Sequence, residues 1–300
     1  MVQPPVVISN LIGGLGNQMF QHACGRALAH RLGRPLKVSL DMFAGYRLHQ
    51  GFELQRVFGV TTEPVDAASL RPVLGWRAHP LARRLLEKLP APVAALAGAT
   101  VERPGEDLSA LAARAPVSHC YLQGYWQSER YFAAQAALVR DDFRFREPAR
   151  DENARIAASM AEGTAVSIHV RRGDYVSNAK NASIYAACDL GYYERAIAHV
   201  LARAPDARLY VFSDDPSWVR EALLPRHPAM TLVSHNRGRD SYNDMRLMSM
   251  CRHHVIANSS FSWWGAWLNP DPAKIVVAPQ GWYADGRDDS GLVPEAWVRL

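Results

Sequence analysis

Two adjacent arginines, Arg171 and Arg172, stand in the segment His-Val-Arg-Arg-Gly-Asp over residues 169–174, directly after an apolar run. On an extended chain neighbouring side chains point to opposite faces, so one guanidinium can face a ligand while the other braces a neighbour such as Asp174. A guanidinium suits a pyrophosphate because it donates paired, charge-assisted hydrogen bonds. The competing interpretation is a surface ion pair, which contributes under about 1 kcal/mol. The pattern alone leaves both open.

Two carboxylates, Asp214 and Asp215, follow the apolar run 208–212 and precede Pro216. They could bind a divalent metal, cap the helix that Pro216 opens, or accept hydrogen bonds from a base such as guanine. The chain has no Asp-x-Asp sequence. A metal site of the kind usual in nucleotide-sugar enzymes therefore lacks its ligands, and positive side chains would have to stabilise the phosphates.

A polar segment follows the apolar run 253–257 and consists of Asn258, Ser259, Ser260, Phe261 and Ser262. Serines that open a helix offer hydroxyl and backbone N–H groups to a phosphate, aided by the helix dipole, although an ordinary N-cap also explains them. Three tryptophans follow within residues 263–267. Dense packing explains these better than a platform for a sugar.

A glycine-rich loop, with Gly14, Gly16 and Asn17, occupies residues 13–17. Met19 stands where a dinucleotide fingerprint needs its third glycine, so the signature for that cofactor is weak. The loop still predicts close approach of a ligand to the backbone.

The elements that must position these residues alternate. Apolar runs at 6–9 and 36–40 flank a helical pattern at 18–32 that Gly33 ends, which predicts a βαβ unit. Five further strands are predicted at 165–170, 208–212, 230–234, 253–257 and 274–278, and helices at 151–162, 192–204, 216–224, 241–251 and 261–268. This pattern predicts a doubly wound parallel sheet, with ligands beyond the carboxyl ends of its strands. We place a domain boundary at 147–151 and so predict domains 1–150 and 151–300.

Composition excludes several classes of protein. With 300 residues, 48% hydrophobic and 21% charged, the chain is neither disordered nor fibrous. The longest weakly polar stretch has 11 residues, against about 20 for a membrane-spanning helix. The N-terminus lacks the features of a signal peptide, so we expect a cytoplasmic protein. The four cysteines are far apart, which favours free buried thiols.

The net charge is +5, without the basic and aromatic stripe of a nucleic-acid binder. Residues 71–103 carry six basic and two acidic side chains. A solvated basic surface is favoured there, and a peripheral contact with the inner membrane stays open.

Several motifs in order carry a family resemblance: residues 13–21, 169–175, 213–215, 244–251 and 258–268. Together they strongly resemble glycosyltransferase family 11, the α-1,2-fucosyltransferases, in its bacterial form. Residues 43–116 contain no motif that we can align with the family.

The resemblance implies a GT-B-like α/β fold, with two Rossmann-like domains that face a central cleft. The C-terminal domain would bind GDP-fucose, and the N-terminal domain would take the galactose-terminated acceptor. It also implies inverting, metal-independent transfer of L-fucose from GDP-β-L-fucose to O2 of a terminal β-galactoside. GDP-fucose is then a co-substrate, and no cofactor is expected. A non-catalytic nucleotide- or glycan-binding module of the same fold is the alternative.

The resemblance also implies roles for single residues. Arg171, or else Arg172, would stabilise the departing GDP, helped by Ser259 to Ser262. His169 would position the donor near its ribose or phosphate, and one of Asp214 and Asp215 would read guanine. The remaining donor-binding residues are Gly14, Gly16, Asn17, Asp244, Asn258, Ser260 and Phe261. Asp174 and Asp41 are the two carboxylates considered as the general base, although a strong base is not obligatory in a dissociative reaction.

Overall fold

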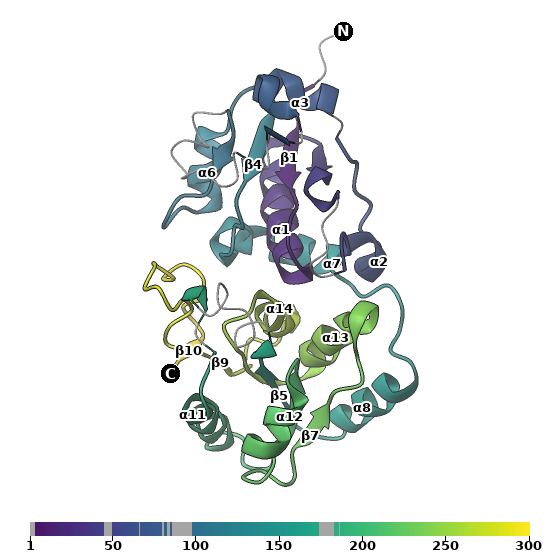
Figure 1. The fold of residues 1–300 in the computed structure, drawn as a ribbon, viewed down its shortest axis with the longest axis vertical. Coiled ribbons are helices and arrows are strands. Elements are labelled where there is room, and N and C mark those ends of the chain that lie inside the picture. Colours follow the sequence, from purple (N-terminus) through teal and green to yellow (C-terminus); the bar gives the residue numbers. More distant parts are fainter. Residues whose placement is uncertain are drawn as a thin grey trace. The chain divides into compact units, whose positions relative to one another are not determined.

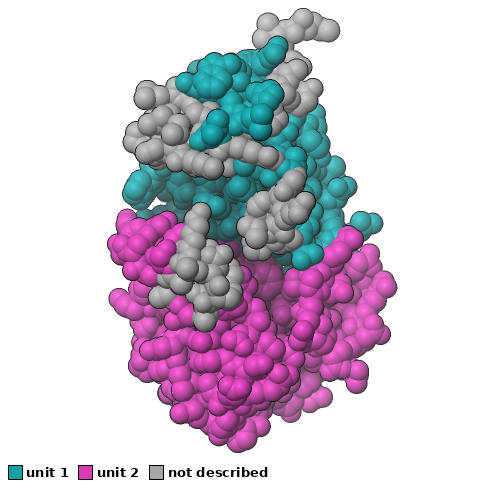
Figure 2. All heavy atoms as spheres, viewed as in Figure 1, with its two compact units in different colours: residues 1–146 teal, residues 147–300 magenta. Residues whose placement is uncertain are grey.

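The computed structural model describes residues 4–44, 50–65, 67–79, 81–82, 85, 98–173, 183–185 and 187–300. The chain divides into two compact units, Met1–Arg146 and Glu147–Leu300 (Figure 2). Each unit holds one parallel sheet with helices connecting its strands (Figure 1). The predicted α/β class is therefore confirmed. The division lies close to the boundary that we predict after residue 150.

The sheet of the first unit has the order β2-β1-β4-β3. Its strands are β1 (Val7–Asn10), β2 (Leu36–Ser39), β3 (Thr100–Val101) and β4 (Cys120–Gln123). Since β2 and β4 pair with opposite sides of β1, the strand order reverses between β1 and β4. In open parallel sheets ligands bind beyond the carboxyl ends of the strands at such a reversal.

The helical segments of this unit are α1 (Leu15–Leu32), η1 (Asp41–Phe43), α2 (Leu54–Phe58), α3 (Ala67–Leu74), η2 (Gly75–Ala78), α6 (Leu108–Arg114), η3 (Glu129–Tyr131), η4 (Ala133–Gln135) and α7 (Ala136–Asp142). Gly33 ends helix α1, as predicted. Its φ of 62° lies in the left-handed region, which is typical of a glycine after the last helical residue. The helix starts three residues before the predicted start because Gly14, in extended conformation, is its N-cap. Most of the helix is buried, including its polar Gln18 and Gln21.

The sheet of the second unit has the order β10-β9-β8-β5-β6-β7. Its strands are β5 (Ala165–Val170), β6 (Arg208–Ser213), β7 (Thr231–Val233), β8 (His253–Val255), β9 (Val276–Ala278) and β10 (Val298–Arg299). All five predicted strands are confirmed. The sixth, β10, has only two residues, too few for a sequence pattern. Here the strand order reverses between β5 and β8.

The helical segments of the second unit are α8 (Asp151–Ala161), α11 (Leu190–Leu201), α12 (Pro216–Trp218), the π-helical turn η5 (Val219–Leu223), η6 (Gly238–Asp240), α13 (Tyr242–Met250) and α14 (Ser260–Leu268). The helix predicted over 216–224 is thus a short α-helix followed by a π-helical turn.

Apolar packing covers both faces of the second sheet. In one cluster Ile168 of β5 packs with Ile197 of α11. In the other, Phe212 of β6 packs with Met160 of α8 and Leu247 of α13. Helices therefore cover the two faces, as expected of a doubly wound sheet. All four cysteines are free and buried, as predicted.

Candidate functional site

The reversal between β5 and β8 brings two of the predicted segments to one place in the second sheet. Ile168 of β5 pairs with Val255 of β8, so the residues that follow the two strands leave the same edge. These are residues 171–173 and 256–262. Strand β6, with Asp214 and Asp215 at its end, lies on the other side of β5. The positions after three adjacent strands thus carry the candidate groups.

Arg171 forms an ion pair with Asp214, with 3.0 Å between Nη1 and Oδ2. Both side chains are about a quarter exposed. Gly173 makes this approach possible, because a Cβ there would lie 2.8 Å from the same carboxylate oxygen. The guanidinium is therefore oriented at the strand end before any phosphate binds.

Arg172 is held by a different set of contacts. Its backbone N–H donates to Asp214 (2.9 Å), and its Nε lies 3.6 Å from Oδ2 of Asp215. Its guanidinium also lies 4.5 Å from the ring centroid of Trp218. Both arginines thus form ion pairs with the carboxylates after β6. Asp174, the brace considered from the sequence, lies outside the described residues.

Asp215 is the N-cap of α12, as the capping interpretation requires. Its Oδ1 accepts a hydrogen bond from the N–H of Trp218 (3.1 Å), and Pro216 follows at the first helical position. Ser213 accepts in turn from the N–H of Asp215 (2.9 Å). Capping and the two arginines account for the known contacts of this pair. A role in reading guanine stays a prediction.

His169, within β5, is buried, and its ring lies 5.9 Å from that of Phe261. Among the described residues its Nδ1 has no hydrogen-bond partner. Burial lowers the pKa of His169 to about 4. The positive charge of Arg171 also lowers this pKa, whereas the Asp214 carboxylate raises it. The imidazole is therefore neutral at pH 7.

The serine segment opens helix α14. Ser259 is its N-cap and accepts from the N–H of Phe261 (3.3 Å), so the capping interpretation is confirmed. Ser262 is buried, with its hydroxyl near the carbonyls of Ala257 and Ser259. The amide of Asn258 donates to the carbonyl of Trp282 (3.0 Å). Asn258 and Ser262 thus brace the loop, while partly exposed Ser260 and Phe261 lie at its surface.

The tryptophans after this segment are packing residues, as predicted. Trp263 and Trp264 are fully buried, and their rings meet edge to face with centroids 5.0 Å apart. The indole of Trp263 donates to the carbonyl of Leu292 (2.9 Å). These contacts fix the start of α14 against the rest of the unit.

Asp244 lies in the first turn of α13, close to polar residues that the sequence did not single out. Its Oδ1 accepts from the amide of Asn236 (2.7 Å), and Asn236 exchanges two hydrogen bonds with Asn153. Burial raises the pKa of Asp244 to about 7, although the Asn236 bond opposes it. The Asn236 amide thus only partly offsets the cost of burying the ionised form.

The glycine loop, residues 13–17, runs into the first turn of α1 in the first unit. Gly13 has a φ of 86°, and a Cβ on it would lie 2.8 Å from Nδ2 of Asn17, so only glycine fits. Gln18 donates to the carbonyls of Gly13 (2.9 Å) and Gly51 (2.8 Å). The loop is thus tightly tied to α1.

The two carboxylates considered as bases have different outcomes. Asp41 opens η1 after β2, and the hydroxyl of Ser39 is 3.4 Å from its Oδ2. Asp174 is outside the described residues. The sequence did not single out another carboxyl, that of Glu102, which is discussed below as a positioning group and not as a base. Glu102 follows the two-residue strand β3, inside the stretch without a family motif. Its distance in sequence from every motif left no signal for it.

The described residues contain no group of three or more His, Cys, Asp or Glu side chains that could hold a metal ion. They also contain no helix with the length and hydropathy needed to span a membrane.

Comparisons with known proteins agree on one family. Residues 104–299 match the family model described as Glycosyl transferase family 11. An alpha-1,2-colitosyltransferase from Escherichia coli is 32% identical over 298 residues, covering 98% of this chain and 99% of that protein. The O-antigen biosynthesis glycosyltransferase WbnK, also from Escherichia coli, is 29% identical and covers 97% of this chain and 99% of its own.

A solved structure shows the same fold. The fucosyltransferase NodZ from Bradyrhizobium matches with a TM-score of 0.51 at 17% identity, over 90% of this chain and 94% of that one. Together with the two parallel sheets, this match confirms the predicted GT-B-like class with two Rossmann-like units.

Proposed function

Because the chain belongs to glycosyltransferase family 11, we propose that it transfers L-fucose from GDP-β-L-fucose to O2 of a terminal β-galactoside. Membership establishes the class of enzyme, a glycosyltransferase. The donor, the acceptor, the inversion to an α-1,2 linkage and the independence from metal are the proposal. GDP-fucose acts in it as a co-substrate, and no cofactor takes part.

The observation that carries the proposal is the place of Arg171. It lies at the strand-order reversal of the second sheet, where the serine segment also begins helix α14. A cation beside a helix N-terminus suits a pyrophosphate. The neutral imidazole of His169 lies near Phe261 of this segment, with the ring centroids 5.9 Å apart.

The reaction breaks the bond between C1 of fucose and the oxygen of the β-phosphate, and that oxygen takes the electron pair. Arg171 exchanges Asp214 for the phosphates, and with the hydroxyl of the partly exposed Ser260 and the N–H groups that open α14 it stabilises the charge that develops there. O2 of the acceptor bonds to C1 from the opposite face and loses its proton. Asp174 and Asp41 are the proposed proton acceptors. Gly14, Gly16 and Asn17 stay proposed donor-binding residues.

Guanine offers two neighbouring donors, a ring N–H and an amine, to one carboxylate. Asp214 and Asp215 stay candidates, but each already faces an arginine. Asp244 has no ion pair among the described residues, and burial raises its pKa. Two guanine donors would supply what its ionised form lacks. We therefore propose Asp244 as the base reader ahead of the pair.

The similarity to the alpha-1,2-colitosyltransferase from Escherichia coli favours GDP-colitose as the second donor to test. Colitose is 3-deoxy-L-fucose, so a site that bonds the 3-hydroxyl would reject it strongly, whereas an apolar site would not. The test is incubation with GDP-fucose or GDP-colitose and a panel of galactosides, with and without EDTA, followed by NMR of the linkage. Transfer of fucose to O2 in EDTA supports the proposal. GDP binding without turnover would support the non-catalytic module instead.

We also propose that the enzyme works in the cytoplasm and touches an anionic membrane surface through residues 71–88. This segment carries five basic side chains and one acidic one, so its net charge is +4, against +5 for the whole chain. Trp76, Leu81 and Leu85 in it are 73%, 63% and 66% exposed. Exposed tryptophan and leucine beside arginines are typical of helices that bind at a lipid interface.

A further inference from the structure

The strand-order reversal in the first sheet lies between β1 and β4, and two hydrogen bonds connect the segments that follow these strands. In the first, Nε2 of Gln21 in α1 donates to the carbonyl of Gly124 (3.2 Å). In the second, Nε2 of Gln127, after β4, donates to Oδ1 of Asn17, after β1 (2.8 Å). Asn17 belongs to the glycine loop, and its own side chain packs over Gly13. The conformation of the glycine loop is therefore tied to that of residues 124–127.

Residues 124–127 adopt an unusual conformation. Trp126 has a φ of 55°, in the left-handed region that large side chains rarely adopt, and its indole is fully buried edge to face against Tyr131 (5.1 Å). Such a backbone persists only where its surroundings hold it. The N–H of Trp126 donates to Oε2 of Glu102 (2.8 Å). Gly124 permits this contact, since a Cβ there would lie 3.1–3.2 Å from the Glu102 side chain.

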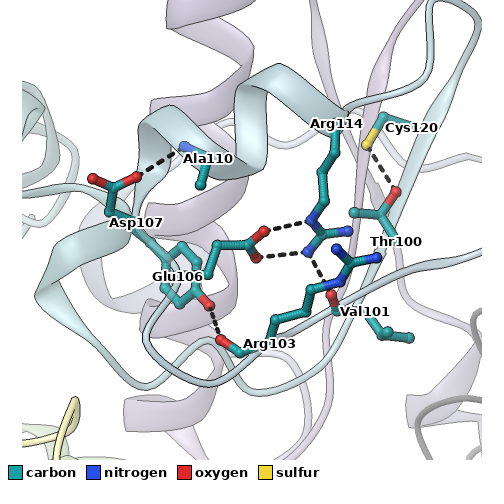
Figure 3. Close-up of polar contacts among 9 residues, drawn as sticks. Thr100, Val101, Arg103, Glu106, Asp107, Ala110, Arg114 and Cys120 are labelled. Atoms are coloured by element: carbon teal, nitrogen blue, oxygen red, sulfur yellow. Dashed lines mark hydrogen bonds and ion pairs between the residues drawn. The ribbon is translucent and has the colours of Figure 1, made fainter.

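The backbone on both sides of Glu102 is fixed by other side chains (Figure 3). Arg114 of α6 donates to the carbonyl of Val101 (2.6 Å) and pairs with both oxygens of Glu106. The hydroxyl of Tyr131 donates to the carbonyl of Arg103 (3.3 Å). The Glu102 carboxylate is thus presented from a rigid segment.

The electrostatics of Glu102 agree with this geometry. Burial raises its pKa, and the backbone N–H groups of Trp126, Tyr125 and Gln127 oppose the rise. The carboxylate therefore interacts with three successive amides of the loop. Replacing it with a neutral amide would weaken all three interactions.

We propose that Glu102 is a positioning residue: its carboxylate holds the loop 124–127, and Gln127 of that loop orients Asn17 at the glycine loop. The effect on transfer rests on the proposed function, in which Asn17 contacts the donor. The effect on the glycine loop itself does not. The two can therefore be tested separately.

The first test is hydrogen exchange of the unliganded protein, read by mass spectrometry. Glu102→Gln should speed exchange in peptides covering 124–128 and also 13–18. Glu63→Gln is the matched control, since it removes a carboxyl of the same unit that pairs with Lys37 and contacts neither Arg114 nor the loop. It should leave peptide 13–18 unchanged. Unchanged exchange at 13–18 in Glu102→Gln would overturn the proposal, whatever the enzyme transfers.

The second test measures transfer. Glu102→Gln and Gln127→Ala should each lower kcat/KM about tenfold, and the double variant should lose no more than either single one, because both break one chain of contacts. Effects that multiply to about a hundredfold would refute the chain. If Glu102→Gln does not fold, Gln127→Ala still tests the hydrogen bond between Gln127 and Asn17. This variant should keep the wild-type Tm, while hydrogen exchange in peptide 13–18 becomes faster. Unchanged exchange of that peptide in Gln127→Ala would equally refute the proposal.

Discussion

Arg171 and Asp214 join the ends of the neighbouring strands β5 and β6 through an ion pair of 3.0 Å. Each side chain is about a quarter exposed, so solvent screens the pair and it contributes about 1 kcal/mol or less to stability. A guanidinium held this weakly can exchange its carboxylate for a phosphate at small cost. The pair orients Arg171 without making it a structural necessity.

We expect Arg171→Ala to lower kcat/KM at least about a hundredfold, the scale seen when one oxyanion donor is lost. Arg171→Lys should recover little, because an ammonium cannot make the paired contact. Steady-state kinetics check this. The control is Arg208→Ala, which breaks an exposed ion pair with Glu162 at the other end of the sheet. Near-native turnover in both Arg171 variants would move the phosphate role to Arg172 or elsewhere.

Nucleotide preference separates the three carboxyl groups. Asp244→Asn should lose about 1.5–3 kcal/mol of GDP affinity and little ADP affinity, since a charged acceptor is lost. Asp215→Ala should lose about 1 kcal/mol of stability with its cap and keep the preference. Calorimetric titration with GDP and ADP, beside the Tm of each variant, measures both. Should Asp214→Asn or Asp215→Ala abolish the preference while Asp244→Asn keeps it, guanine is read by the pair.

The pKa of Asp244, about 7, predicts a pH dependence of stability. Between pH 4 and 7 the folded state retains a proton that the unfolded state has lost, so this group makes the protein less stable as pH rises through that window. Asp244→Asn removes the effect. Relative to wild type, the variant should gain roughly 2–3 kcal/mol between pH 5 and pH 8, measured by urea unfolding. An unchanged difference would mean that the carboxyl titrates normally.

The sequence predicted β5 and β6 of the second unit well because each strand has six residues, most of them buried. All six residues of β5 are buried, and a mostly apolar run of this length predicts a buried strand. The pairing of Arg171 with Asp214 was not predictable, because it depends on how β5 and β6 align. Glu102 escaped for a related reason: β3 has two residues, and the partners of Glu102 come from a loop 24 positions later.

Vesicle binding tests the basic segment 71–88. The protein should sediment with vesicles that contain about a third anionic lipid, should bind zwitterionic vesicles weakly, and should dissociate as salt rises, because surface attraction falls off within the Debye length. Trp76→Ser with Leu81→Ser should reduce binding at least about tenfold, since both side chains are exposed and would enter the interface. Arg71→Glu should weaken binding to anionic vesicles only.

The matched control is Val117→Ser, which changes an apolar side chain of the same unit that is 87% exposed but lies outside the segment. It should bind as the wild type does. If the segment is only a solvated surface, all variants will stay equally in the supernatant, with unchanged Tm. Equal binding by the variants and the wild type would place any membrane contact elsewhere on the chain.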